Sequence, residues 1–212
     1  MELYCDRAIF MKRMTLSRHC MEPNFIGSWL LEPIDICDEL VHYFETNEQQ
    51  QQQGVTTSGA LLHHKNSIDI TIKPKDILAS NNSIFERYFN DLFCCYQDYV
   101  LQWPFLKTFA TKLDIGHFNM QRYGPGQHFQ KVHTERAGID TLHRVFAFMT
   151  YLNDVDLNDG GSTYFSHYDI DIQPQKGLTL IWPAEWTHAH KGNLLTSNNK
   201  YIITGWLHFP SD

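Results

Sequence analysis

Hydrophobic positions in the first half of the chain follow helical and strand periods in turn. Apolar residues recur at helical spacing within residues 33–44, which predicts a helix that buries one face: Ile36, Leu40, Val41 and Phe44. Residues 83–103 show a similar spacing and are followed by Pro104, which predicts a second, longer helix. Strict alternation over residues 67–72 predicts a strand, and residues 24–31 are also expected to form one. Residues 1–23 lack a clear period and are expected to form an irregular or strand-like lead-in.

From residue 112 onward the hydrophobic runs are short and β-rich, and turn sequences such as Gly124-Pro125-Gly126 separate them. The expected strands cover residues 116–123, 145–152, 162–165, 178–182 and 201–209. Many short strands with frequent turns are typical of a sandwich or barrel. The pattern therefore predicts a mainly β fold with flanking helices, in a single domain over residues 1–212. Residues 1–110 are expected to form a mostly helical support region, and residues 111–212 the β core.

Composition narrows the class of protein. The chain has 212 residues, 42% of them hydrophobic, and a formal net charge of −7 with scattered Lys and Arg. No basic stripe of the kind that binds nucleic acid is visible. No apolar run reaches 18 residues, and the first residues carry no apolar signal segment, so no membrane span or secretion signal is expected. Five Cys residues without a CxxC motif predict reduced thiols and a cytoplasmic location. The sequence does not indicate an oligomeric state.

The first candidate for chemistry is the triplet His133-Thr134-Glu135. Residues two apart on a strand point to the same face, so an imidazole and a carboxylate would converge. A second His from a distant strand would complete a two-histidine, one-carboxylate set, which non-haem iron(II) oxygenases use because it leaves coordination positions open. The stretch around residues 187–192 offers two candidates for that His, namely His188 and His190.

Further residues occur in a fixed order around this triplet. They are Tyr123-Gly-Pro-Gly-Gln-His-Phe129, Arg144, Tyr151-Leu-Asn-Asp-Val155, Gly160-Gly-Ser-Thr163, Pro174, Gly177, His190-Lys-Gly192, Lys200-Tyr201 and Trp206. In this order residues 110–209 resemble the prolyl 4-hydroxylase-like branch of the 2-oxoglutarate oxygenases. The resemblance implies a double-stranded β-helix (a jelly-roll, cupin-like core). It also implies the cofactor set of Fe(II), 2-oxoglutarate and O2, with ascorbate as a candidate reductant.

The resemblance assigns the metal ligands to His133, Glu135 and His190. Its relatives usually carry Asp at the second position, whereas this chain has Glu, which is still an anionic oxygen donor. A carboxylate here argues against halogenation, and Glu favours a small, amino-acid-like substrate. His190 is preferred because Lys200 follows it by ten residues, as in the relatives; His188 is the alternative and would otherwise orient a ligand or water.

The resemblance also assigns the residues that bind 2-oxoglutarate. Lys200 is expected to pair with its distal carboxylate, because a buried dianion needs a matched cation. Tyr123, Thr163 and Thr150 are expected to hydrogen-bond to it. Two further residues are open between two roles: Arg144 contacts substrate or forms a structural ion pair, and Trp206 forms a pocket wall or belongs to the core.

The resulting hypothesis is a dioxygenase that hydroxylates an unactivated C–H of a small-molecule or peptidyl substrate and releases succinate and CO2. One alternative is a cupin-like metalloenzyme that does not use 2-oxoglutarate, for which Lys200 would be irrelevant. Another is a catalytically inactive jelly-roll that binds a ligand or a protein. A structural zinc site would need several Cys ligands at short spacing, and the sequence has none.

Overall fold

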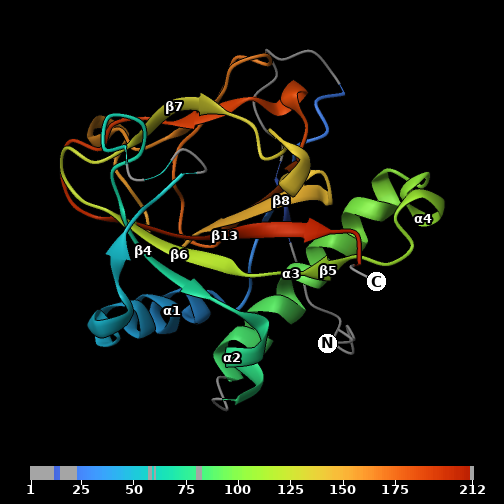
Figure 1. The fold of residues 1–212 in the computed structure, drawn as a ribbon, viewed down its shortest axis with the longest axis horizontal. Coiled ribbons are helices and arrows are strands. Elements are labelled where there is room, and N and C mark those ends of the chain that lie inside the picture. Colours follow the sequence, from blue (N-terminus) through green and yellow to red (C-terminus); the bar gives the residue numbers. More distant parts are fainter. Residues whose placement is uncertain (1–11, 15–22, 57–58, 60, 80–82, 211–212) are drawn as a thin grey trace.

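Two facing β-sheets form the body of the protein, and helices cover the outer face of the larger one (Figure 1). The structure is a computed structural model that describes residues 12–14, 23–56, 59, 61–79 and 83–210. Most of the expected lead-in over residues 1–23 lies outside the described residues.

The larger sheet has nine strands in the order β1-β2-β11-β8-β13-β6-β4-β3, with β5 paired to β13. Its pairs are antiparallel throughout. The strands are β1 (Lys12–Arg13), β2 (Gly27–Leu30), β3 (Gln52–Gln53), β4 (Ile68–Ile72), β5 (Asp114–Ile115), β6 (Phe118–Tyr123), β8 (Arg144–Tyr151), β11 (Leu178–Pro183) and β13 (Lys200–His208).

The smaller sheet has four antiparallel strands in the order β10-β9-β12-β7. They are β7 (Phe129–His133), β9 (Thr163–Phe165), β10 (Ile170–Ile172) and β12 (His190–Gly192). In Figure 1 this sheet lies above the larger one, and the space between them is filled by a second core cluster that includes Tyr123, Tyr151, Phe165 and Trp182. This two-sheet arrangement is the jelly-roll that the family resemblance implies.

The main hydrophobic core lies on the other face of the larger sheet, beneath the helices. The α-helices are α1 (Asp35–Thr46), α2 (Pro74–Ala79), α3 (Ser83–Gln102) and α4 (Leu106–Phe109), and the short 3-10 helices are η1 (Glu48–Gln50), η2 (Ile139–Thr141), η3 (Leu157–Asp159) and η4 (Trp186–His188). Phe89 of α3 packs edge-on against Phe118 of β6 and Phe148 of β8. The amphipathic face of α3 thus closes this core from outside.

The two long helices and the strands expected at residues 24–31 and 67–72 are all present, with ends that differ by a few residues. The N-terminal half therefore supplies strands as well as helices, because β2, β3 and β4 join the larger sheet. One local expectation is wrong: β7 ends at His133, so Glu135 lies in a bend just beyond the strand rather than on it.

The described cysteines differ in their bonding state. Cys94 is disulfide-bonded, whereas Cys37 is a buried free thiol. The expectation of reduced thiols is thus wrong for Cys94, and the cytoplasmic location stays a prediction.

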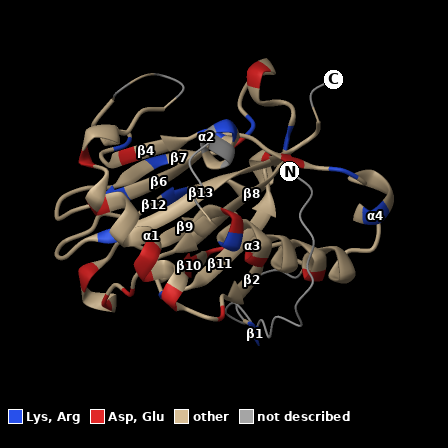
Figure 2. Ribbon diagram, turned by 90° about the horizontal axis from the view of Figure 1, so that it is seen from below, with Lys and Arg blue, Asp and Glu red and all other residues tan. Residues whose placement is uncertain are grey.

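None of the helices in the described part of the chain combines the length and hydrophobicity that a membrane-spanning helix requires. Figure 2 shows that Lys and Arg are dispersed along the ribbon among acidic residues.

Candidate active site

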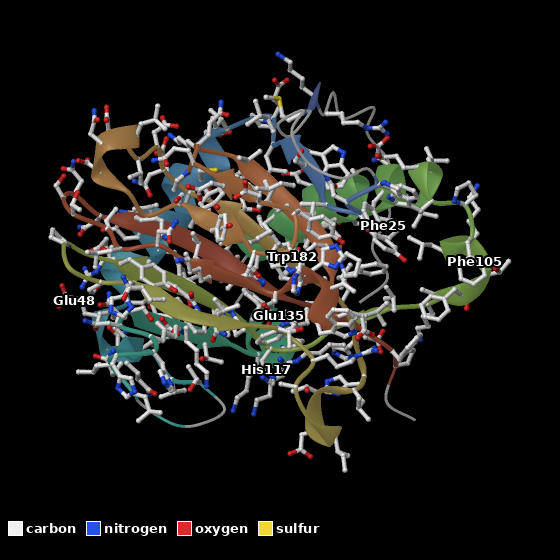
Figure 3. All side chains as sticks on the ribbon, turned by 90° about the horizontal axis from the view of Figure 1, so that it is seen from above. Phe25, Glu48, Phe105, His117, Glu135 and Trp182 are labelled. Atoms are coloured by element: carbon white, nitrogen blue, oxygen red, sulfur yellow. The ribbon has the colours of Figure 1, made fainter. Side chains whose placement is uncertain are left out.

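Three side chains converge between the two sheets. His133 at the end of β7 and His190 at the start of β12 are directly paired across the smaller sheet. Glu135 follows β7 by two residues and turns toward them. One ligand atom from each of the three lies within 4.8 Å of the other two, and Glu135 Oε1 is 3.4 Å from His190 Nε2. His190, not His188, therefore completes the set of three ligands. In Figure 3 the labelled Glu135 lies near the middle of the molecule.

Backbone contacts fix which nitrogen each histidine offers. The Nδ1 atom of His133 lies 2.9 Å from the carbonyl oxygen of Lys131, and Nδ1 of His190 lies 2.9 Å from that of His188. A carbonyl oxygen only accepts hydrogen bonds, so Nδ1 carries the proton in both rings. Nε2 of each ring is then left with a free lone pair, which is the form that binds a metal.

Aromatic rings hold both imidazoles in place. The Phe129 ring stacks on His133 with the centroids 3.9 Å apart. The two residues belong to the same short strand, and a register shift opposite His190–Gly192 brings them together. His190 is flanked by Phe165 and Trp182 at centroid distances of 5.3 and 5.2 Å. The rings restrict the rotamers of the histidines and exclude water from that side.

Glu135 is held at both its carboxylate and its backbone. The indole Nε1 of Trp206 donates a 2.7 Å hydrogen bond to Glu135 Oε2. Arg144 donates to the backbone oxygen of Glu135 at 2.9 Å and stacks on the Trp206 ring, with its Cζ atom 3.6 Å from the centroid. Trp206 and Arg144, whose roles were open from sequence, thus both contact the ligand set.

The electrostatics suit a cation at this point. Burial and the neighbouring His190 lower the pKa of His133 to about 4, although Glu135 and the Lys131 carbonyl oppose this shift. Burial alone would raise the pKa of Glu135. The proximity of His190 and His133 and the Trp206 hydrogen bond outweigh it and lower that pKa to about 2. At neutral pH the site therefore presents a neutral imidazole beside an ionised carboxylate.

A buried ammonium lies farther along the space between the sheets. Lys200 is 3% exposed, donates a 2.6 Å hydrogen bond to the Gly161 carbonyl and lies 4.6 Å above the Tyr123 ring. Among the described residues, no carboxylate lies within ion-pair distance of it. Burial lowers the pKa of Lys200 to about 7. A buried cation with no counter-ion fits a pocket for an anionic ligand.

Thr163 belongs to this pocket, together with a residue that the sequence argument overlooked. The Tyr151 hydroxyl donates a 2.7 Å hydrogen bond to the Thr163 hydroxyl, which leaves the Thr163 proton available for another acceptor. Both residues are buried, and Gly161, which contacts Lys200, precedes Thr163 by two positions. The pattern of β8 does not indicate that Tyr151 faces the pocket, because the strand is buried on both faces.

The expected contact of Thr150 with the cosubstrate is wrong. Thr150 neighbours Tyr151 on β8, so its side chain points to the opposite face of the sheet. There its hydroxyl lies 2.9 Å from the Tyr88 hydroxyl of α3 and 2.7 Å from the Thr179 hydroxyl of β11. Both partners lie on the helix side, so Thr150 supports the core instead of the site.

A second buried cation was also overlooked. Lys65 and Asp69 form an ion pair of 2.5 Å, and their side chains are 4% and 11% exposed. The Asp69 carboxylate also accepts hydrogen bonds from Ser67 at 2.7 Å and from Gln121 at 3.3 Å. Gln121 in turn accepts one from the Tyr123 hydroxyl at 2.7 Å. This network fixes the ring that lies under the pocket ammonium.

His188, the alternative ligand, has a structural role. Its ring lies 2.8 Å from the Asn24 carbonyl oxygen through Nε2 and 2.9 Å from the Thr187 hydroxyl through Nδ1. Its backbone oxygen receives the contact from His190 described above. His188 therefore joins the segment before β2 to the segment that carries the distal ligand.

The two sets of residues fit the cofactors that the sequence suggests. Two imidazole nitrogens and one carboxylate oxygen match the donor set of non-haem iron(II), and three further positions would remain open. The lone ammonium, with the Thr163 hydroxyl nearby, matches a carboxylate. The indole Nε1 of Trp182, beside His190, is buried and has no hydrogen-bond partner among the described residues, so the wall of the site also offers an unused donor.

Comparisons with known proteins agree with this geometry. Residues 118–208 match the 2OG-Fe(II) oxygenase superfamily, a stretch that contains all three candidate metal ligands and Lys200. No curated protein matches the sequence significantly.

Three solved structures share the fold. A prolyl-4-hydroxylase from Pseudomonas putida has a TM-score of 0.68 at 15% identity, covering 87% of this chain and 93% of its own. A prolyl hydroxylase from Trichoplax adhaerens, in complex with a peptide fragment of the oxygen degradation domain of hypoxia inducible factor, has a TM-score of 0.64 at 14% identity, covering 88% and 84%. The viral collagen prolyl hydroxylase from Paramecium Bursaria Chlorella virus-1, in complex with 2-oxoglutarate, has a TM-score of 0.62 at 15% identity, covering 88% and 97%.

The sequence match and the buried ligand set lead to the same assignment. Residues 118–208 carry the match to the 2OG-Fe(II) oxygenase superfamily on the fold of the prolyl hydroxylases, and with the buried ligand set they support a 2-oxoglutarate-dependent dioxygenase that uses Fe(II), 2-oxoglutarate and O2.

Proposed function

We propose that this dioxygenase hydroxylates an unactivated C–H of a peptidyl substrate and releases succinate and CO2. The observation that carries the proposal is the pairing of two buried sites. The His133–Glu135–His190 set offers three ligands on one side, and Lys200 has no counter-ion among the described residues in the same space between the sheets. A molecule with a metal-chelating end and a distal carboxylate fits both.

Bound iron with 2-oxoglutarate and O2 supplies the oxidising chemistry, and the chain supplies binding, orientation and exclusion of water. Lys200 and the Thr163 hydroxyl bind the distal carboxylate, and Tyr123 supports the ammonium from below. Phe129, Phe165 and Trp182 surround the two histidines, which excludes solvent from that side of the site.

Arg144 is the chain's best candidate for orienting the substrate. Its guanidinium is partly exposed beside the ligand set and uses one nitrogen for the Glu135 carbonyl. A guanidinium has five N–H donors, so others remain for a carbonyl or carboxylate of the substrate. The Trichoplax adhaerens enzyme with its bound peptide and the viral collagen prolyl hydroxylase support a peptidyl substrate. A free amino-acid-like molecule is the second candidate, because Glu135 stands where relatives usually have Asp.

The proposal is tested by succinate release from 2-oxoglutarate with anaerobically iron-loaded protein that is then exposed to O2, without added substrate. Slow uncoupled turnover is expected for the wild type, none for His133→Ala, and turnover only at high 2-oxoglutarate for Lys200→Ala. His167→Ala is the matched control, because His167 is exposed, packs its ring against the exposed Trp186 and is not part of the ligand set. A peptide library and a set of free amino acids then distinguish the substrate classes by stimulation of succinate release and a mass increase of one oxygen.

Absence of wild-type turnover, with no 2-oxoglutarate-dependent change in the optical spectrum of the iron-loaded protein, would contradict the proposal. Metal-dependent oxidation that is indifferent to Lys200→Ala would instead favour the cupin-like alternative.

A further inference from the structure

The most unusual contact of the metal site is the hydrogen bond between the Trp206 indole and Glu135. The two carboxylate oxygens of Glu135 have different surroundings. Oε2 accepts the 2.7 Å hydrogen bond from Trp206 Nε1, whereas Oε1 faces His190 Nε2 at 3.4 Å. A hydrogen bond from a polarised N–H to a carboxylate is among the stronger kinds, particularly where water is excluded. The Glu135 side chain is 14% exposed, so Oε2 has little water to replace a lost partner.

We infer that Trp206 is a positioning residue that holds Oε2 aside, so that Oε1 alone is presented to the metal. A carboxylate is able to bind a metal through one oxygen or two. Held through Oε2, Glu135 fills one coordination position and leaves three open, as 2-oxoglutarate and O2 require. The longer side chain makes this contact possible, since an Asp at residue 135 would be one methylene shorter and would not extend both to the metal and to the indole.

A second contact explains why the indole stays in place. The Arg144 guanidinium lies 3.6 Å from the centroid of the Trp206 ring, and the same side chain donates to the Glu135 backbone oxygen. Stacking of a guanidinium on an indole is favourable, most of all when both are partly desolvated. Arg144 therefore joins the ring that positions the carboxylate to the backbone that carries it.

The inference rests on the metal site of the proposed oxygenase but not on its substrate. Its test is a double-mutant cycle of Trp206→Phe and Glu135→Asp, with Mn(II) as the probe and affinity measured by calorimetry. Trp206→Phe is expected to weaken Mn(II) binding about tenfold in the Glu135 background, as loss of outer partners of metal ligands typically does. In the Glu135→Asp background the same substitution is expected to change nothing, because the contact is already absent. Trp186→Phe is the matched control, since Trp186 is 67% exposed and the indole that donates to Glu135 is that of Trp206.

Water-proton relaxation of the Mn(II)-loaded protein supplies a readout that a loss of stability would not mimic. If Glu135 binds through both oxygens in Trp206→Phe, one of three open positions is lost, and the relaxation enhancement is expected to fall by about a third. An NMR spectrum of Zn(II)-loaded wild type and Glu135→Asp avoids any Trp206 variant, in case Trp206→Phe does not fold. One indole N–H signal is expected downfield of the others and to move upfield in Glu135→Asp.

The outcomes distinguish a failure of the proposed function from a failure of the inference about Trp206. Failure of the wild type to bind Mn(II) would contradict the proposed function itself. If the wild type binds Mn(II) normally, but Trp206→Phe weakens Mn(II) binding equally in both backgrounds or in neither, only the role of Trp206 is overturned. An indole signal that is unchanged in Glu135→Asp would overturn it as well.

Discussion

Binding of 2-oxoglutarate is expected to take up a proton, because Lys200 is buried with no counter-ion in the part of the chain that the structure describes. Burial lowers the pKa of Lys200 from its ordinary value of 10.5 to about 7. That difference corresponds to about 5 kcal/mol disfavouring the charged side chain in the free protein. A carboxylate placed beside Nζ offsets this cost and raises the pKa again. The complex then holds an ammonium where the free protein, above pH 7, holds a neutral amine.

The number of protons taken up follows from the pKa of Lys200 in the free protein, about 7, and its higher pKa in the complex. At pH 8 about 0.9 of the Lys200 side chains are neutral in the free protein, so about 0.9 proton is taken up per bound ligand. At pH 6 the uptake falls to about 0.1. The affinity for 2-oxoglutarate is therefore flat below pH 7 and falls up to tenfold per pH unit above it. The free protein behaves in the opposite way: the unfolded chain binds more protons between pH 7 and 10.5, so stability rises with pH over that range.

Calorimetry of 2-oxoglutarate binding to Mn(II)-loaded protein measures the uptake directly, when buffers with different heats of ionisation are compared at one pH. Lys200→Arg is the control, because a guanidinium stays charged and should show neither uptake nor a pH-dependent affinity over this range. The reasoning is refuted if the wild type takes up less than about 0.2 proton at pH 8, or if its affinity is constant from pH 6 to 9.

Three further substitutions test the surroundings of the site. Asp69→Asn leaves the buried Lys65 ammonium unpaired and should lower the free energy of unfolding by about 3–5 kcal/mol in urea denaturation. The control is Asp38→Asn, at an ion pair whose carboxylate side chain is 72% exposed, which should cost less than about 1 kcal/mol. Equal losses for the two variants would contradict this. Gly205→Ala places a Cβ 2.7 Å from Phe148 and should cost about 1–3 kcal/mol in thermal unfolding, whereas Gly138→Ala meets nothing within 4 Å and should not show that loss. Thr163→Val should raise the KM for 2-oxoglutarate without a matching fall in kcat, since it removes a hydroxyl from the cosubstrate side; a change in kcat alone would place Thr163 elsewhere.

The sequence contains the ligand set and most of the helices and strands, because both are local patterns. The metal-ligand triplet His133-Thr134-Glu135 and the distant His190-Lys191-Gly192 can be recognised without knowing how the chain folds. So can the helical periods that became α1 and α3. The spacing to Lys200 already favoured His190 over His188, and the cross-strand register that sets His190 beside His133 confirms it, because both histidines are buried.

The misplacement of Thr150 has a different physical origin. Seven of the eight residues of β8 are buried, since one face of the strand meets the helices and the other the jelly-roll interior. A strand buried on both faces shows no alternation between polar and apolar residues, so its sequence does not reveal which face a residue occupies. The Lys65–Asp69 pair was missed for a related reason. Its partners Gln121 and Tyr123 come from β6, about fifty residues away, and only folding brings them together.

Because His133 and His190 are paired across two strands, a bound metal would also stabilise the fold. β7 is the last strand of the smaller sheet, and His133 is its final residue. An ion bound by both histidines would act as a clip across two neighbouring strands and would close a chain segment of more than fifty residues. Ligands that bind only the folded state add their binding energy to its stability. Loss of iron should therefore release the end of β7 first, and the rate of amide hydrogen exchange there would report how much of the enzyme is loaded.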